Sequence, residues 1–240
     1  LQSLGSFDTD RTRPAYQWLS QLRDNDAAQV HRYLDLGAAL EICHGPVDVL
    51  AADAVRELLA MNPGKPVILA ESGGVEPRHT GPFKLYGDDK DGVILHDVLF
   101  APFFVGAAGA GQCWHWTEYV DRNNLWPQFR GFSEAVHGID PAAEKFRPRL
   151  IEHPRLRIYA LEGQHTTLIW CRDNQNTWGS ELEQKRAPEE LQELTVVLGR
   201  IAAAPKQAAS IYDPWKHAWS KASVVDGAIR LPDFKRSIVI

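Results

Sequence analysis

A glutamate at the end of a short apolar segment is the first side chain in this sequence that could do chemistry. The apolar run Val67 to Ala70 follows Pro66 and ends at Glu71, with Gly73 and Gly74 close behind. An apolar run bounded by Pro and Gly predicts a buried strand of a parallel sheet. Barrel enzymes keep catalytic groups at the carboxyl ends of such strands. Glu71 is therefore a candidate catalytic group, although a glutamate here could also cap a helix or pair with a lysine.

Imidazole and aromatic side chains stand on the two neighbouring predicted strands. His31 and Tyr33 lie two residues apart, so a strand points both side chains to one face, and Trp114 and Trp116 have the same spacing. If the strand ends meet, the Tyr33 hydroxyl can donate to Glu71 and keep it ionised. An indole can then form an apolar floor for a sugar ring. Taken singly, His31 and Tyr33 are as readily core residues, and the tryptophans could simply fill the interior.

Units of a strand followed by a helix must position these residues. Strands are expected over residues 1–6, 27–33, 66–71 and 112–116, and helices over residues 13–23, 48–61, 93–105 and 125–139. The last helix has the clearest apolar periodicity, and Asp48 is the expected N-cap of the second. Four such units indicate βα architecture, and an eight-fold barrel needs roughly 250 residues. Residues 1–147 are therefore expected to form half of a (β/α)8 TIM barrel.

The sequence pattern changes after Pro148 to short alternating segments. Further strands are expected over residues 156–161, 166–171, 194–198, 208–212, 223–225 and 238–240. Short strands separated by turns indicate an antiparallel β-sandwich. We expect this second domain to cover residues 155–240.

Composition narrows the functional classes. The 240 residues are 44% hydrophobic and 24% charged, which is typical of a globular protein. A net charge of -5 argues against nucleic acid as a partner, and no apolar run approaches the roughly 20 residues of a membrane span. Three widely spaced cysteines form neither a disulfide framework nor a CxxC metal motif. No metal or other cofactor is expected.

The strand segments also resemble the last four βα units of clan A glycoside hydrolases. The resemblance covers about residues 1–145 and rests on Asp26…His31-x-Tyr33, on Lys65-Pro-Val-Ile-Leu-Ala-Glu71-x-Gly73, and on Gly106-Ala-Ala-Gly109-Ala-Gly-Gln-Cys-Trp114-His-Trp116. Clan A enzymes are retaining (β/α)8 hydrolases that include cellulase-like and mannanase-like families, often followed by a small β-sandwich.

What the resemblance implies is specific at the residue level. The chain would hold strands five to eight of the barrel, with Glu71 as the nucleophile at the end of strand seven. His31 and Tyr33 match positions that line the sugar subsite and contact the nucleophile. Trp116, or Trp114, matches the tryptophan that floors the subsite. The resemblance also implies that the substrate is a poly- or oligosaccharide. It favours export from the cytoplasm, because polysaccharide-degrading enzymes are commonly exported.

The second carboxyl group of such a mechanism is the difficulty. A retaining glycosidase needs a nucleophile and a general acid about 5–5.5 Å apart. In the clan the acid follows an Asn at the end of strand four, and no Asn-Glu pair occurs in this chain. Glu76 and Glu118 do not match its position. We therefore expect this chain to lack the general acid. Either it is a piece of a longer protein, with the rest of the barrel on another polypeptide or cleaved away, or it is catalytically impaired. We expect it to pair with the missing N-terminal half barrel or with a second copy, which would cover its open strand edges.

Three other functions fit parts of the sequence. The main alternative is a non-catalytic carbohydrate-binding protein on a glycosidase scaffold. Another is a metal-dependent hydrolase that uses His31, Glu71 and His115, because metals accept such ligands. The alternation of the strand disfavours it, since His115 should point away from the face that carries Trp114 and Trp116. A purely structural domain is the last.

Overall fold

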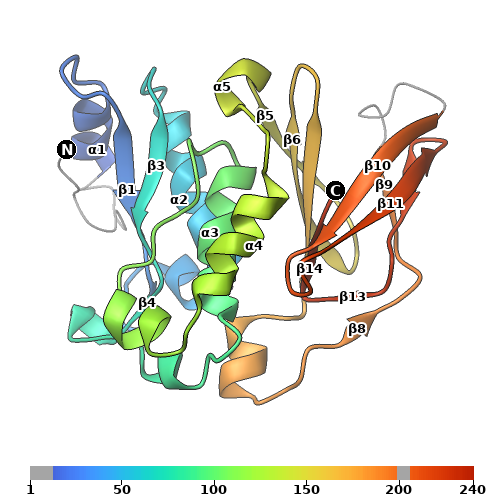
Figure 1. The fold of residues 1–240 in the computed structure, drawn as a ribbon. Helices are drawn as coiled ribbons and strands as arrows, with labels where there is room; N and C mark the ends of the chain where they lie inside the picture. Colours follow the sequence, from blue (N-terminus) through green and yellow to red (C-terminus); the bar gives the residue numbers. More distant parts are fainter. Residues whose placement is uncertain (1–12, 199–205) are drawn as a thin grey trace.

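The computed structural model describes residues 13–198 and 206–240, without the side chains of residues 206–208. A helical part with short parallel strands packs against a large antiparallel sheet (Figure 1). The class is therefore mixed helix and sheet. The strand expected over residues 1–6 lies outside the described residues.

The helical part follows the predicted order of elements closely. Its longer elements are α1 Arg13–Ser20, β1 Ala28–His31, α2 Val47–Ala60, β3 Val67–Glu71, α3 Val93–Phe104, α4 Trp126–Ala135 and α5 Pro141–Glu144. Between them lie β2 Leu34–Asp35, β4 Gly74–Val75, short 3-10 turns at Glu41–His44, Pro77–His79 and Lys84–Gly87, and a π-helical turn at Trp116–Asp121. The four predicted helices are confirmed as α1 to α4, each within a few residues of its expected ends.

Three chain segments run side by side and end at the same edge. β1 pairs with β3 in parallel, with a bulge that brings His31 opposite Glu71, and β2 pairs with β4 in parallel. The strand expected over residues 112–116 is reduced to one parallel bridge, between Ser72 and Cys113. Backbone hydrogen bonds from Gln112 to β3 and from Trp114 to Ser72 nevertheless hold this segment beside β3.

Two of the helices fill the space behind these strands. α3 is buried along its whole length, because it is apolar on all sides. α2 buries the face that carries Leu50, Val55 and Leu58. The expected N-cap role of Asp48 is wrong: Pro46 occupies the cap position, and the Asp48 carboxylate accepts hydrogen bonds from Arg157 and Tyr159 of the large sheet.

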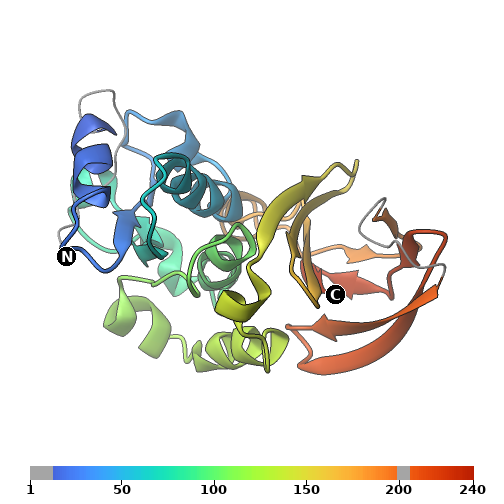
Figure 2. The same ribbon diagram turned by 90° about the horizontal axis from the view of Figure 1, so that it is seen from above.

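The second part consists of eight strands in one antiparallel sheet and a small two-stranded ribbon. The sheet order is β5 Arg147–Ile151, β6 Leu156–Glu162, β7 Thr167–Asp173, β14 Ser237–Val239, β10 Lys206–Asp213, β11 Ala218–Val225, β12 Ala228–Arg230 and β9 Thr195–Val197. The ribbon pairs β8 Glu190–Leu191 with β13 Phe234–Lys235. The six predicted strands are confirmed, and β5, β8, β12 and β13 are additional. The eight strands form one curled sheet (Figure 2), so a sandwich of two separate sheets is not confirmed.

The curled sheet joins both parts through its two faces. One face holds a core of its own that includes Ile158, Cys171 and Val196. The other face, with Tyr159 and Trp170, belongs to the same hydrophobic cluster as α2 and α3. The domain ranges 1–147 and 155–240 stay a prediction. None of the helices within residues 13–198 and 206–240 has the length and apolar character that crossing a membrane requires.

Candidate active site

A pocket of about 270 Å³ lies where β1, β3 and the segment after Cys113 end. It is lined by His31, Tyr33, Glu71, Val75, His79, Gly81, Trp114 and His115. Four of the five residues expected at a site, Glu71, His31, Tyr33 and Trp114, are therefore brought together. Trp116 is not among the lining residues.

Two side chains contact the same carboxylate oxygen of Glu71. The Tyr33 hydroxyl donates to Oε2 over 2.6 Å, and Nδ1 of His31 lies 2.9 Å from the same atom. The Glu71 side chain is 28% exposed, so solvent or a ligand can reach it. No other described residue forms a hydrogen bond with Oε1 of this carboxylate, which leaves that oxygen available.

Burial shifts the pKa values of both side chains that contact Glu71 in the directions that favour their neutral forms. Burial raises the pKa of Tyr33 well above its ordinary value, and its hydrogen bond and proximity to the Glu71 carboxylate raise it further. Burial also lowers the pKa of His31, and the Glu71 charge only partly opposes this effect. Tyr33 therefore donates to Glu71 as a neutral phenol.

The turn after Glu71 needs glycine for steric reasons. Gly73 has a φ of +108°, and a Cβ there would lie 2.5 Å from the Tyr86 hydroxyl oxygen. A Cβ on Gly74 would lie 2.8 Å from Cβ of Phe83. The Gly74 amide donates to the Tyr86 hydroxyl. The Tyr86 ring stacks on the Tyr119 ring, with the two ring centroids 3.8 Å apart. The Gly-Gly pair therefore lets a packed aromatic layer come against the backbone that carries Glu71.

A short loop forms one wall of the pocket. His79 contacts the Tyr33 ring edge-on, with ring centroids 5.0 Å apart, and its Nε2 lies 3.5 Å from an Asp35 carboxylate oxygen. Both Arg78 and His79 have positive φ values, 62° and 56°, which are uncommon for residues with side chains. The sequence did not suggest His79, because it lies in a Gly- and Pro-rich loop without periodicity.

The two tryptophans of the Trp114-His-Trp116 segment are separated. Trp114 lines the pocket and is 55% exposed. Trp116 begins the π-helical turn and stacks on Phe129 and Trp126, with centroid distances of 5.5 and 6.1 Å. The expectation that both indoles share one face is wrong, because the chain leaves its extended conformation at Trp116.

The expectation that His115 points away from the site is also wrong. His115 lines the pocket and is 9% exposed, and its buried Nδ1 has no hydrogen-bond partner in the described part of the chain. Burial lowers its pKa, against the opposing charge of Glu118. Residues 13–198 and 206–240 nevertheless contain no group of three His, Cys, Asp or Glu side chains arranged to hold a metal ion.

Glu71 is the only carboxylate among the described residues that line this pocket. Glu76 accepts a hydrogen bond from the backbone of Lys84, and neither it nor Glu118 lines the pocket. The described residues therefore offer one carboxylate here and not the pair that acid-and-nucleophile chemistry requires.

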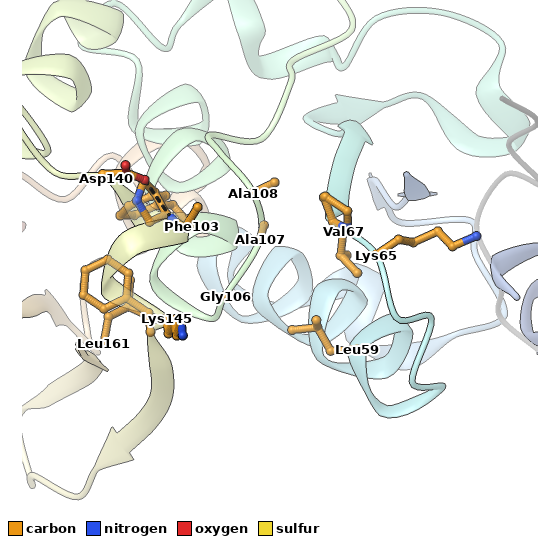
Figure 3. Close-up of a pocket in the computed structure, with 14 residues that line it drawn as sticks. Leu59, Lys65, Val67, Phe103, Gly106, Ala107, Ala108, Asp140, Lys145 and Leu161 are labelled. Atoms are coloured by element: carbon orange, nitrogen blue, oxygen red, sulfur yellow. Dashed lines mark hydrogen bonds between the residues drawn. The ribbon is translucent and has the colours of Figure 1, made fainter. Parts of the chain in front are cut away.

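A larger groove, of about 460 Å³, lies at the other end of β3 (Figure 3). Two of its three charged side chains are already engaged. The Lys65 ammonium donates to the carbonyls of Leu22 and Asn25 and extends away from Ala107, and Asp140 caps α5. The third is Lys145. The groove has no carboxylate besides the capping Asp140, so the Glu71 pocket remains the candidate active site.

Comparison with known proteins gives few matches. No protein-family model matches the chain, and no curated protein is similar to it. Among solved structures it is similar to a GH30 endoxylanase from Clostridium papyrosolvens, at 12% identity and a TM-score of 0.40, over 89% of this chain and 47% of that one. It is also similar to a beta-porphyranase of glycoside hydrolase family 86 from Bacteroides plebeius, at 14% identity and a TM-score of 0.35, over 89% and 40% of the two chains. The chain spans less than half the length of either protein.

Proposed function

We propose that this chain is part of a retaining glycoside hydrolase in which Glu71 is the nucleophile. The observation that carries the proposal is the environment of Glu71. Tyr33 donates to one carboxylate oxygen, His31 lies 2.9 Å from the same oxygen, and the partly exposed Glu71 side chain shares a pocket with an exposed indole, Trp114.

In this mechanism four residues of the pocket have defined tasks. Oε1 of Glu71 attacks the anomeric carbon as the bond to the leaving oxygen breaks, and a glycosyl ester forms. Water then hydrolyses the ester and restores the carboxylate. Tyr33 orients Glu71 through its hydrogen bond to Oε2, and His31 packs against the same oxygen. Trp114 offers an apolar face to the sugar ring.

The general acid of this proposal comes from outside the described pocket. β1 is hydrogen-bonded to β3 alone among the described strands, so no described strand covers its second edge. An open strand edge favours pairing with another segment. We place the acid on an N-terminal half barrel or on a second copy of the chain that covers this edge.

Activated fluoro-sugars test the nucleophile without the acid. A dinitrophenolate leaving group departs as an anion and needs no proton, so Glu71 should be trapped as a glycosyl ester by 2-fluoro glycosides with this leaving group. A panel with gluco, manno, xylo and galacto configuration would be incubated with the chain, and peptides would be analysed by mass spectrometry. Labelling of the peptide that contains Glu71, and none in Glu71→Gln, is the expected result. A label on another residue, or no label with any sugar, would exclude this assignment.

The alternative is a non-catalytic carbohydrate-binding protein, which the presence of one carboxylate in the pocket favours. It predicts that wild-type protein and Glu71→Gln bind the same oligosaccharide, and that neither forms an ester. Calorimetric titration beside the labelling experiment separates the two functions.

A further inference from the structure

A second and larger groove lies on the sheet side of the molecule, away from Glu71. It has a volume of about 680 Å³, within the range of about 300–1,000 Å³ that is usual for ligand sites. It lies between the end of α4, the turn from β6 to β7, and strands β10 and β11, where its polar and aromatic lining includes His137, Gln164, His165, Thr167, Ser210 and Trp219. It shares no lining residue with the Glu71 pocket.

The described lining of this groove carries no carboxylate, ammonium or guanidinium side chain. Charged residues make up 24% of the sequence, so a lining of this size without one is unusual for this chain. Burying a charged ligand group without a partner is costly. The groove therefore suits an uncharged ligand.

Trp219 gives the groove an exposed aromatic face. It is 56% exposed. Trp219 of β11 lies opposite the buried Tyr212 of β10, and the two ring centroids are 4.8 Å apart. Tyr212 is itself fixed by a hydrogen bond from its hydroxyl to Glu134 of α4. The indole is thus supported on one side and open on the other. A large aromatic ring with a polar N–H is suited to ligands that have both apolar and polar surface.

Uncharged hydrogen-bonding side chains line the same groove as Trp219. The side chains of His137, Gln164 and Ser210 form no hydrogen bond with another described residue. The turn that carries Gln164 is held in place, because Glu144 accepts from the backbone amides of His165 and Thr166. The groove therefore offers amide, imidazole and hydroxyl groups to a ligand that also contacts Trp219.

We propose that this groove binds a neutral oligosaccharide, with one sugar face on Trp219 and sugar hydroxyls hydrogen-bonded to Gln164, His137 and Ser210. Neutral sugars combine an apolar ring face with uncharged donors and acceptors, which is the chemistry that the groove offers. The site is distinct from the Glu71 pocket, and its occupation does not depend on whether Glu71 is a nucleophile. Where both sites act, the groove would hold a polymer near the enzyme between cleavage events.

Calorimetric titration with xylohexaose, cellohexaose and mannohexaose tests the groove. At least one of the three should bind the wild-type chain, and Trp219→Ala should weaken its binding about tenfold or more, as loss of a central aromatic anchor does. Trp219→Phe should keep most of the affinity, because it keeps an aromatic face. Trp18→Ala is the matched control: Trp18 is also exposed, at 63%, but lies on α1. Glu71→Gln and Trp114→Ala should retain the Trp219-dependent binding.

A second measurement keeps the test valid if Trp219→Ala does not fold. The indole N–H resonance of Trp219, identified by its loss in Trp219→Phe, should shift when the binding sugar is added to the wild-type chain. Absence of binding by all three sugars at millimolar concentration would refute the proposal. So would binding that leaves the Trp219 signal unmoved and is unchanged in Trp219→Ala. Because Glu71→Gln is tested beside these variants, failure of the groove is distinguishable from failure of the proposed nucleophile.

Discussion

The side-chain contacts of Glu71 fall on one of its two carboxylate oxygens. The Tyr33 hydroxyl donates to Oε2, and Nδ1 of His31 lies 2.9 Å from the same atom. Under the proposed mechanism, Oε1 is therefore the oxygen that acts as the attacking group.

Removing the Tyr33 hydroxyl should slow the chemistry that we propose. Tyr33→Phe deletes the 2.6 Å hydrogen bond to Glu71 but keeps the ring that contacts His79. A hydrogen bond to a charged group contributes about 1.5–3 kcal/mol, so the rate of labelling by the fluoro-sugar should fall about 10- to 100-fold. Time courses of ester formation by mass spectrometry provide the measurement.

Tyr212→Phe is the control for this substitution. It removes a similar hydrogen bond, to Glu134, at a place remote from the pocket. Its labelling rate should equal that of the wild-type chain. Equal rates for Tyr33→Phe and Tyr212→Phe would mean that Tyr33 does not act on Glu71.

The sequence predicted the members of the pocket that lie on regular strands. His31 and Glu71 end the parallel strands β1 and β3, and a bulge after Val30 brings the two residues opposite each other. The same rule misplaced His115 and Trp116, because the chain turns into a π-helix there. His79 could not be predicted, since its position depends on loop residues with positive φ.

At the scale of elements, the junction of β3 and β4 depends on one glycine. Gly73→Ala combines a positive φ with a Cβ only 2.5 Å from the Tyr86 hydroxyl. We expect a loss of about 1–3 kcal/mol in the free energy of unfolding from backbone strain, plus a shift of the strand end that carries Glu71. Urea unfolding followed by fluorescence, together with the fluoro-sugar assay, measures both effects.

Gly109→Ala provides the comparison at a glycine without these constraints. A Cβ on Gly109 meets no atom within 4 Å, and its φ is not in the left-handed region. Its stability and labelling rate should be close to wild type. If both alanine variants were equally stable, the steric argument for Gly73 would be wrong.

Elements with strong periodicity were predictable, and elements that depend on distant partners were not. α2, α3 and α4 follow from apolar spacing and breaker residues. β5 is an edge strand with mostly exposed residues, among them two Arg and a Pro, so it lacks the alternation of a half-buried strand. Asp48 looked like a cap because its actual partner, Arg157, is far along the chain.

At the scale of the whole molecule, buried ion pairs join the helical part to the curled sheet. Asp97 of α3 accepts from Arg172 of β7 over 2.8 Å, and both side chains are almost fully buried. Breaking a buried pair by removing one partner is destabilising by about 3–5 kcal/mol, because the other charge stays buried. Asp97→Ala should therefore lower the free energy of unfolding by that amount, measured by urea unfolding.

Asp88→Ala is the matched control for the loss of a salt bridge. Asp88 pairs with Lys185 on the surface, with both side chains more than half exposed. Such pairs are screened by solvent, so little change in stability is expected.

Because α3 and β7 share one core, Asp97→Ala should also unfold in a single transition. Two separate transitions would show that the helical part and the sheet unfold independently.

A buried histidine at the same junction makes stability depend on pH. His96 of α3 lies between Gln128, which faces its Nδ1, and Ser237, which donates to its Nε2. Burial lowers its pKa far below the ordinary value of 6.5, and the charges of Arg172 and Arg236 lower it further. The folded protein therefore keeps this imidazole neutral at pH values where the unfolded chain binds a proton.

The sign of the effect follows from that difference in proton binding. Above pH 6.5 both states leave His96 neutral, so its contribution to stability is complete. As the pH falls below 6.5, the unfolded state gains a proton that the folded state does not, and the free energy of unfolding decreases by up to about 1.4 kcal/mol per pH unit. The decrease continues until the pH reaches the pKa of His96 in the folded protein.

Comparison of slopes isolates His96 from the other groups that titrate. The free energy of unfolding would be measured between pH 5 and 7.5 for wild type, His96→Gln and His44→Gln, a partly exposed histidine in the turn Glu41–His44. His96→Gln should be less stable at every pH but should lose stability less steeply below pH 6.5, because glutamine binds no proton. His44→Gln should keep the wild-type slope. Equal slopes for all three proteins would mean that His96 can be protonated in the folded state, and that the junction between α3 and the sheet opens to water more readily than its burial indicates.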